Sequence, residues 1–145
     1  MENEEGFKVE GCETLLYVED DDELRKLMTQ FFRAKGIKVF ETHNAEAAID
    51  LFENHGNEID AVISDIVMPQ CSGVDLFQVL HSSNPSIPFI FVSGYSQKEI
   101  LGDEILPPNT RFIEKPCSPI DILNELSQFS FYNESAIKSA RSSIS

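Results

Sequence analysis

Midway along the chain lies the segment Ala61-Val62-Ile63-Ser64-Asp65-Ile66-Val67-Met68-Pro69. Its apolar start is typical of a strand buried on both faces, and its proline bounds the loop that follows. The Asp65 carboxylate therefore leaves a rigid strand end, and its oxygens can still reach solvent. Taken alone, Asp65 is most simply a loop aspartate that accepts backbone hydrogen bonds. A second interpretation arises because polar residues also follow three other predicted strands.

Similar apolar runs along the chain predict a regular alternation of strands and helices. Strands are expected at residues 14–18, 37–40, 59–64, 88–92 and 111–113. Helices are expected where apolar residues recur at helical spacing: Leu24, Leu27, Met28, Phe31 and Phe32; then Ala48, Leu51 and Phe52; then Val74, Phe77 and Leu80; and finally Ile122, Leu123, Leu126 and Phe129. A capping box at Ser96-Gln97-Lys98-Glu99 begins one more, short helix. This alternation requires a parallel sheet with helices on both faces.

Composition limits the classes of protein to which this chain can belong. Its 145 residues, 41% of them hydrophobic, are enough for one domain with a real core. A formal net charge of −14 opposes nonspecific binding to nucleic acid and favours cationic partners or a bound metal. We expect an acidic flexible leader at residues 1–11, one domain at 12–130 and a mobile, serine-rich tail at 131–145.

Cysteines, histidines and apolar stretches bear on the compartment and on metal binding. The three cysteines, Cys12, Cys71 and Cys117, lack C-x-x-C spacing, which favours reduced thiols in a cytoplasm. The three histidines share no metal-ligand spacing, so we interpret them as surface residues. No apolar stretch approaches the roughly 20 residues of a membrane span, and the N-terminus is acidic rather than a signal sequence. No membrane association is therefore expected.

An acidic run, Glu19-Asp20-Asp21-Asp22-Glu23, follows the first predicted strand. The helix dipole stabilises acidic side chains in a first helical turn, and this alone can explain the last three residues of the run. Glu19 and Asp20 differ because they sit directly on the strand end. Ligands bind an open parallel sheet at the carboxyl ends of its strands, where these two carboxylates are expected beside Asp65. Their mutual repulsion calls for a cation, and oxygen ligands suit Mg²⁺.

Ser93-Gly94 and Lys115-Pro116 follow the fourth and fifth predicted strands. In isolation, the first pair is an ordinary turn and the second contains a solvated surface lysine. At this edge of the sheet, however, the Ser93 hydroxyl can donate to a phosphoryl oxygen, and the Lys115 ammonium can pair with a carboxylate or a phosphate. Pro116 is a candidate for the cis isomer, which is found in tight turns.

Together these motifs closely resemble the receiver domain of two-component response regulators. The resembling segments are Leu16-Tyr17-Val18-Glu19-Asp20-Asp21, Asp65-Ile66-Val67-Met68-Pro69 with Gly73, Phe91-Val92-Ser93-Gly94, and Phe112-Ile113-Glu114-Lys115-Pro116. The resemblance extends from about residue 13 to residue 129. It implies a flavodoxin-like, three-layer α/β fold, in which a five-stranded parallel sheet of order 2-1-3-4-5 is accompanied by five helices.

The resemblance also implies a role for each polar strand end. Asp65 would be the phosphoacceptor, taking a phosphoryl group from a histidine kinase or a histidine phosphotransfer protein. Asp20 would ligate Mg²⁺ directly and Glu19 mainly through water, while Asp65 and the backbone carbonyl of Val67 would complete the protein's share. Lys115, together with Ser93, would hold the phosphoryl oxygens.

Signalling would follow from a movement of the loop after the fourth strand. By the same resemblance, Ser93 and the aromatic ring of Phe112 are the switch residues, and the face made by the fourth helix, fifth strand and fifth helix meets a downstream effector protein. A phosphorylation-dependent homodimer is a further expectation. Such a domain catalyses only its own phosphoryl transfer and dephosphorylation, so it is not expected to act as an enzyme on other molecules. Either a free-standing receiver or part of a hybrid kinase fits the sequence.

Some positions depart from common receiver sequences, and two other classes remain open. Glu19 replaces an aspartate, Ser93 a threonine and Phe112 a tyrosine found in many members, but none of these changes disables the expected site. A haloacid-dehalogenase-type enzyme would carry its nucleophile after the first strand in a D-x-D pattern, which Asp20-Asp21-Asp22 superficially fits. Against it, Glu23 stands where that family has Thr or Val. A pseudo-receiver that acts only as an interaction module is the second alternative.

Overall fold

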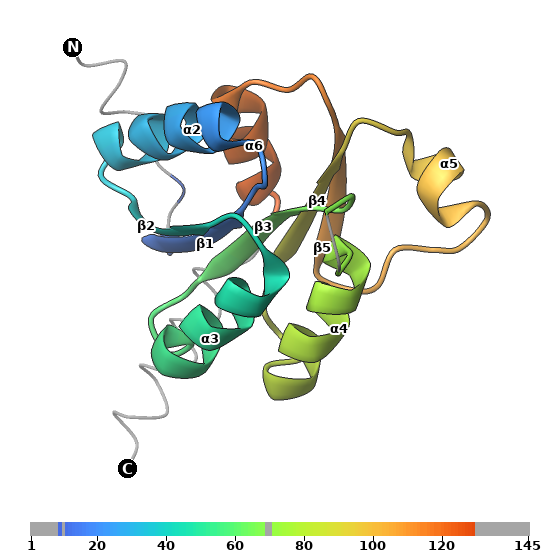
Figure 1. Ribbon diagram of the computed structural model, residues 1–145, viewed down its shortest axis with the longest axis horizontal. Coiled ribbons are helices and arrows are strands. Elements are labelled where there is room, and N and C mark those ends of the chain that lie inside the picture. The colour runs from blue at the N-terminus through green and yellow to red at the C-terminus, as the bar shows by residue number, and fades with distance from the viewer. Residues whose placement is uncertain (1–8, 10, 69–70, 130–145) are drawn as a thin grey trace.

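The computed structural model describes residues 9, 11–68 and 71–129, and this part of the chain is a five-stranded parallel sheet with helices between the strands (Figure 1). The strands are β1 (Thr14–Val18), β2 (Lys38–Thr42), β3 (Ala61–Asp65), β4 (Phe89–Ser93) and β5 (Thr110–Glu114), in the order β2-β1-β3-β4-β5. The helices are α2 (Asp22–Ala34), α3 (Ala45–His55), α4 (Gly73–Ser83), α5 (Gln97–Leu101) and α6 (Pro119–Leu126). The predicted flavodoxin-like α/β fold, with this strand order and five helices, is confirmed.

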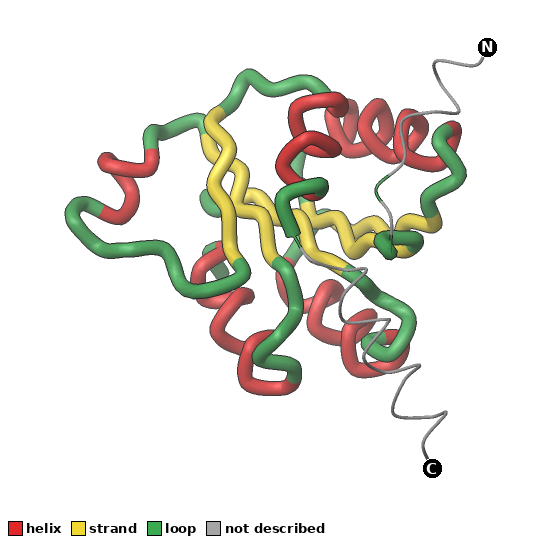
Figure 2. The backbone as a smooth tube through the Cα atoms, turned by 180° about the vertical axis from the view of Figure 1, so that it is seen from behind, coloured by secondary structure: helices red, strands yellow, loops and turns green. Residues whose placement is uncertain are grey.

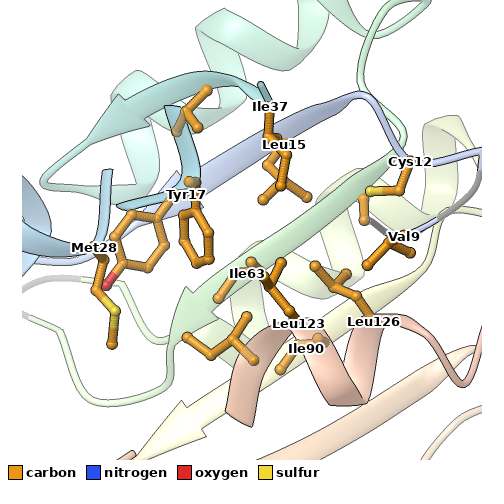
Figure 3. Packing of buried hydrophobic residues seen from close by; sticks show 14 of the residues in the cluster. Val9, Cys12, Leu15, Tyr17, Met28, Ile37, Ile63, Ile90, Leu123 and Leu126 are labelled. Atoms are coloured by element: carbon orange, nitrogen blue, oxygen red, sulfur yellow. The ribbon is translucent and has the colours of Figure 1, made fainter. Parts of the chain in front are cut away.

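The sheet is the middle of three layers. Helices α2 and α6 cover one face and α3 and α4 the other, while the short α5 stands out beside the β4–β5 side of the sheet (Figures 1 and 2). Side chains alternate along each strand, so Leu15 and Tyr17 enter the core on the α2–α6 side, shown in Figure 3, and Leu16 and Val18 enter the other. Because both faces are covered, β1, β3 and β4 are buried throughout, as their apolar sequences predict.

Side chains of residues that precede the helices cap their first turns. The Asn44 side chain accepts a 2.8 Å hydrogen bond from the backbone N–H of Ala47 at the start of α3. Ser96 and Glu99 form the predicted capping box of α5, and Ser118 and Asp121 form a second, unpredicted box at the start of α6. No helix in the described part of the chain combines the length and the apolar character needed to cross a membrane.

The apolar stripe of α2 differs from its prediction. Leu27, expected to face inward, is 61% exposed, whereas Thr29 is 1% exposed. Helix α2 packs against β1, β2 and α6, so tertiary contacts rotate its buried stripe around Met28, Thr29 and Phe32 and leave Leu27 on the outer side. The prediction for Leu27 was therefore wrong, because apolar spacing alone does not fix how a helix is turned against its sheet.

Smaller differences concern the ends of elements. Strand β2 runs over 38–42 instead of the predicted 37–40, and α6 ends at Leu126, before Phe129. Val9, which its acidic surroundings placed in the predicted leader, is buried in the core beside Cys12. The backbone N–H of Cys12 donates to the carbonyl oxygen of Val9 at 3.1 Å. The remaining leader residues, 1–8 and 10, and the tail at 131–145 lie outside the described residues, so their predicted mobility stays a prediction.

Candidate functional site

Strand register brings four polar strand ends to one edge of the sheet. Val18 of β1 pairs with Ser64 of β3, so the residues that follow them, Glu19 and Asp65, come to lie side by side. On the other side of β3, Asp65 pairs with Val92 of β4. Further along, Ser93 pairs with Glu114 at the end of β5, immediately before Lys115. Parallel pairing thus assembles the site from segments far apart in the sequence.

An acidic cluster occupies this edge. Carboxylate oxygens of Glu19, Asp20 and Asp65 lie within 4.8 Å of one another, the only such group among the described residues that could hold a metal ion. Glu19 and Asp65 are 2% and 6% exposed, while Asp20 is open to solvent. Hard oxygen donors with one open side fit a divalent cation such as Mg²⁺, which keeps several of its waters. The predicted convergence of these three residues is confirmed by their geometry.

Lys115 neutralises part of the cluster. Its Nζ donates to Glu19 Oε1 at 2.9 Å and to Asp65 Oδ2 at 3.2 Å. The backbone N–H of Lys115 donates to the carbonyl of Ser93, which fixes the end of β5 against the end of β4. The Lys115–Pro116 peptide bond is cis, as the sequence suggested. Of the two interpretations of this lysine, the paired one is correct.

Burial and charge perturb the two central ionisable groups. Burial, reinforced by the neighbouring charge of Glu19, raises the pKa of Asp65 to about 7 although Lys115 opposes the shift. Burial alone would lower the pKa of Lys115, but its hydrogen bond to Glu19 and the charge of Asp65 outweigh burial and raise it. The folded domain therefore favours the neutral form of Asp65 more than water does, and any added cation favours the carboxylate.

Glu19 is held in place by its own surroundings. Its Oε2 accepts from the backbone N–H of Asp21 at 3.1 Å, and its carbonyl accepts from Arg25 Nη1 at 2.8 Å. Arg25 also pairs with Asp22 and Glu41 and so ties α2 to the strand ends. Arg25 was not predicted as a site residue, because its only local signal in the sequence is the i,i+3 spacing from Asp22.

Ser93 and Phe112 lie where the switch prediction needs them, but their roles stay predictions. Ser93 is fully buried, and its Oγ accepts from the backbone N–H of Tyr95 at 3.0 Å, as in an ordinary turn. Phe112 pairs with Phe91 across β4 and β5 and is only partly buried against the α3–α4 side of the core. Val67 follows β3 with a 53% exposed side chain. The proposed ligand role of its carbonyl also stays a prediction.

Gly73, which the sequence marked only as part of the resembling motif, lies against the backbone of Asp65. A Cβ atom there would lie 2.4 Å from the carbonyl oxygen of Asp65 and 2.9 Å from Cα of Ile66. The N–H of Gly73 donates to the carbonyl of Ile66 at 2.8 Å. The first residue of α4 therefore presses directly on the backbone that carries Asp65, and only glycine fits.

The cysteines and histidines stay outside the cluster. The three cysteines are free thiols, as predicted. His55 stacks on Phe40 and pairs with Glu58, and His81 lies against Phe77. Within the described ranges, none of the histidines joins a group that could hold a metal.

Comparisons with known proteins agree with this geometry. The family model described as response regulator receiver domain matches residues 15–127. The chain is 35% identical over 117 residues to the sensor kinase CckA of Brucella abortus, an alignment that covers 79% of this chain and 12% of the kinase. It spans less than half the length of the curated relatives it matches.

Solved structures give the same result. The receiver domain of the hybrid histidine kinase CckA matches with a TM-score of 0.67 and 28% identity, covering 79% of this chain and 96% of that one. CheY in the CheX–CheY–BeF3–Mg+2 complex from Borrelia burgdorferi represents a second match, with a TM-score of 0.70 and 25% identity over 79% of this chain and 87% of that one. With its fold, its acidic strand-end cluster and these matches, the chain belongs to the response regulator receiver domain family of two-component signalling.

Proposed function

We propose that this domain accepts a phosphoryl group on Asp65 from a histidine kinase or a histidine phosphotransfer protein. The observation that carries the proposal is the buried Asp65 carboxylate, which accepts a hydrogen bond from Lys115. Its oxygen lies within 4.8 Å of carboxylate oxygens of Glu19 and Asp20. In the transfer, a carboxylate oxygen of Asp65 bonds to phosphorus as the phosphorus–nitrogen bond of the phosphohistidine breaks. The freed imidazole takes the bonding electron pair and a proton from solvent.

Asp20, Asp65 and Glu19 are the side chains that would hold Mg²⁺, with the carbonyl of Val67 as a fourth donor. A bound Mg²⁺ would neutralise charge on the phosphoryl oxygens. The solved relative that contains both BeF3 and Mg+2 supports this assignment by analogy. Arg25 donates to the backbone carbonyl of Glu19 and fixes it in place. A glutamate, although longer than the aspartate common at this position, can therefore still hold its carboxylate in the cluster.

Lys115 and Ser93 would bind the oxygens of the transferred group. Lys115 already points at Asp65, and its ammonium can follow the new charge with little movement. The Ser93 hydroxyl, which accepts from Tyr95 in the unmodified protein, can rotate and donate to a phosphoryl oxygen. Pulling on Ser93 would draw the segment before α5 toward the site, and this is the proposed start of the switch.

The face made by α5, β5 and α6 is the proposed output surface for an effector protein or a second copy of the domain. Tyr95 and Ile105, at the two ends of the α5 segment, are 54% and 92% exposed. Arg111 of β5 and Glu125 of α6 form an ion pair across the same face. Exposed apolar side chains together with charged groups suit a reversible protein contact. The free thiols favour a reducing compartment such as the cytoplasm.

The dehalogenase-type alternative is disfavoured by the geometry of its D-x-D pattern. Asp22 lies in the first turn of α2 and pairs with Arg25 at 2.6 Å, so it does not join Asp20 at the strand end. A purely structural interaction module would need no cluster of three carboxylates with a bridging lysine.

Labelling with a small phosphodonor tests the proposal. Incubation with acetyl phosphate and Mg²⁺ should add one phosphoryl group, which peptide mapping should place on Asp65, and chelation of Mg²⁺ with EDTA should prevent the reaction. Labelling of Asp20 instead would favour the dehalogenase-type alternative, and absence of labelling would favour the interaction module.

A metal prediction follows from the repulsion among the three carboxylates. Millimolar Mg²⁺ should raise the melting temperature, because it binds the folded cluster and not the unfolded chain. An effect of about 1–2 kcal/mol corresponds to roughly 3–6 °C for a domain of this size. The Asp20→Asn variant should lose most of the Mg²⁺ effect and melt no lower than the parent protein without metal. Equal melting curves with and without Mg²⁺ in the parent protein would contradict the metal site.

A hydrogen-exchange prediction concerns the switch. Beryllofluoride with Mg²⁺ should change amide protection at residues 93–105 and around Phe112 as well as beside Asp65. Phe112 is only partly buried, and full burial of a phenylalanine contributes about 1.5–3 kcal/mol, enough to shift a two-state equilibrium about tenfold or more. Changes confined to the neighbourhood of Asp65 would refute the switch while leaving phosphoryl acceptance intact.

A further inference from the structure

A cavity of about 320 Å³ lies beside the acidic cluster, between the sheet and helices α2 and α6. Its floor is apolar and deeply buried, with Met28, Val92 and Ile122 between 1% and 4% exposed. Its rim includes the partly exposed Leu24 and Cys117, so the cavity is open to the outside. This volume and this mainly apolar lining fall within the range of small-molecule binding sites.

The hydroxyl group of Tyr17 is a polar group in the wall of this cavity. Tyr17 is 3% exposed and lines the cavity, and Figure 3 shows its hydroxyl directed toward Met28. Among the residues that the structure describes, no group forms a hydrogen bond with this hydroxyl. In the described part of the chain, the one fully buried side-chain polar atom without a partner is Thr29 Oγ1, so the Tyr17 hydroxyl is accessible from the cavity. A phenol hydroxyl can both donate and accept a hydrogen bond.

The charged groups in the cavity wall are already paired. Glu19 Oε1 accepts from Lys115 and Oε2 accepts from the N–H of Asp21. Lys115 also donates to Asp65. A charged ligand would have to break these contacts or remain uncompensated in an apolar space. The chemistry of the cavity therefore favours a neutral ligand whose one polar group meets Tyr17.

We propose that this cavity binds a small, neutral, mainly apolar molecule, about the size of phenol or indole, through a hydrogen bond to the Tyr17 hydroxyl. Apolar atoms of the ligand fill the space between Met28, Val92 and Ile122. The occupant also touches Glu19 and Lys115, the two residues shared by the cavity wall and the acidic cluster. Binding requires neither Mg²⁺ nor a phosphoryl group, so it stands or falls separately from the function proposed above.

An NMR titration of the full chain with indole tests the proposal. We expect saturable binding with a dissociation constant on the order of 1 mM or lower, and shifts at the Met28 methyl and the Val92 and Ile122 signals. Tyr17→Phe keeps the shape of the cavity but removes the acceptor of the indole N–H, and should weaken binding about 5- to 10-fold. Leu24→Trp fills the rim from a partly exposed position and should abolish binding.

Leu27→Ala is the matched control. Leu27 lies on the same helix but is 61% exposed and does not line the cavity, so indole should bind this variant as it binds the parent. Amide spectra establish that each variant remains folded. Equal affinity in all variants, or shifts that rise without saturation, would mean that indole adheres to the surface and would overturn the proposal. A third outcome would also overturn the proposal. If the parent protein did not bind indole and Leu24→Trp slowed phosphotransfer, the cavity would be assigned to a side chain of a partner protein.

Discussion

Replacing Asp65 with asparagine should abolish phosphoryl acceptance entirely. The asparagine amide keeps the shape of the side chain but cannot form an acyl phosphate. Among the described residues, Glu19 is the one other buried carboxylate that accepts a hydrogen bond from Lys115. Mass spectrometry after incubation with acetyl phosphate and Mg²⁺ should show full labelling of the parent and none of the variant. Asp50→Asn, an exposed change on α3, is the matched control and should label normally.

The same substitution should stabilise the unmodified protein at alkaline pH. The pKa of Asp65 is raised from 3.8 to about 7, so the folded state binds the proton more tightly than the unfolded state. The stability associated with the protonated side chain is fully present below pH 3.8 and is lost as the pH rises through 7. Asparagine imitates the neutral form at every pH. The free energy of unfolding of Asp65→Asn should therefore exceed that of the parent by about 1–3 kcal/mol at pH 8, and the difference should shrink toward pH 4.

Urea unfolding without metal at several pH values measures this difference. Lys115 retains its hydrogen bond to Glu19 in the variant, so the lysine does not become an unpaired buried charge. Asp50→Asn should follow the parent at each pH. A stability difference that is constant across the pH range would show that the gain comes from something other than the ionisation of Asp65.

The fold follows closely from the sequence because strand burial leaves a strong local signature. Val62 and Ile63 belong to a run with no polar interruption, which only a strand covered on both faces tolerates, and β3 is indeed fully buried. The alternation of such runs with helical spacing then allows few topologies. Leu27 shows the limit of this reasoning. Its spacing suits the apolar stripe of α2, but contacts with β2 and α6 decide which side of the helix is buried.

The candidate site was predictable in its members and not in its contacts. Asp65, Glu19 and Lys115 could be assigned to one edge because parallel strands end together. The sequence did not predict which of the two carboxylates Lys115 would contact, because that depends on side-chain distances. In the structure Lys115 donates to both. The anchoring of Glu19 by Arg25 and the cavity beside Tyr17 depend on how α2 is placed against the sheet. Such tertiary placement leaves no periodic trace in a single sequence.

Gly73 provides the other large expected effect, because the backbone it touches carries Asp65. In Gly73→Ala the new methyl group would stand 2.4 Å from the Asp65 carbonyl oxygen and 2.9 Å from Cα of Ile66. Both are main-chain atoms, which cannot rotate away as a flexible side chain can. Either α4 or the end of β3 must shift, at an expected cost of about 1–3 kcal/mol or more. The 2.8 Å hydrogen bond from Gly73 to Ile66 is strained by the same shift.

Gly94→Ala separates this steric effect from a general cost of replacing glycine. A Cβ atom at Gly94 would meet no heavy atom within 4 Å, so in the unmodified protein this variant should remain within about 0.5 kcal/mol of the parent. Thermal and urea unfolding of both variants without metal should show a clear loss of stability for Gly73→Ala alone. Phosphoryl labelling of the folded Gly73→Ala protein should also slow, since a shift of the Asp65 backbone separates its carboxylate from Lys115. If the two variants proved equally stable, the close approach of α4 to the end of β3 would be wrong, and with it the view that Gly73 positions the phosphoacceptor.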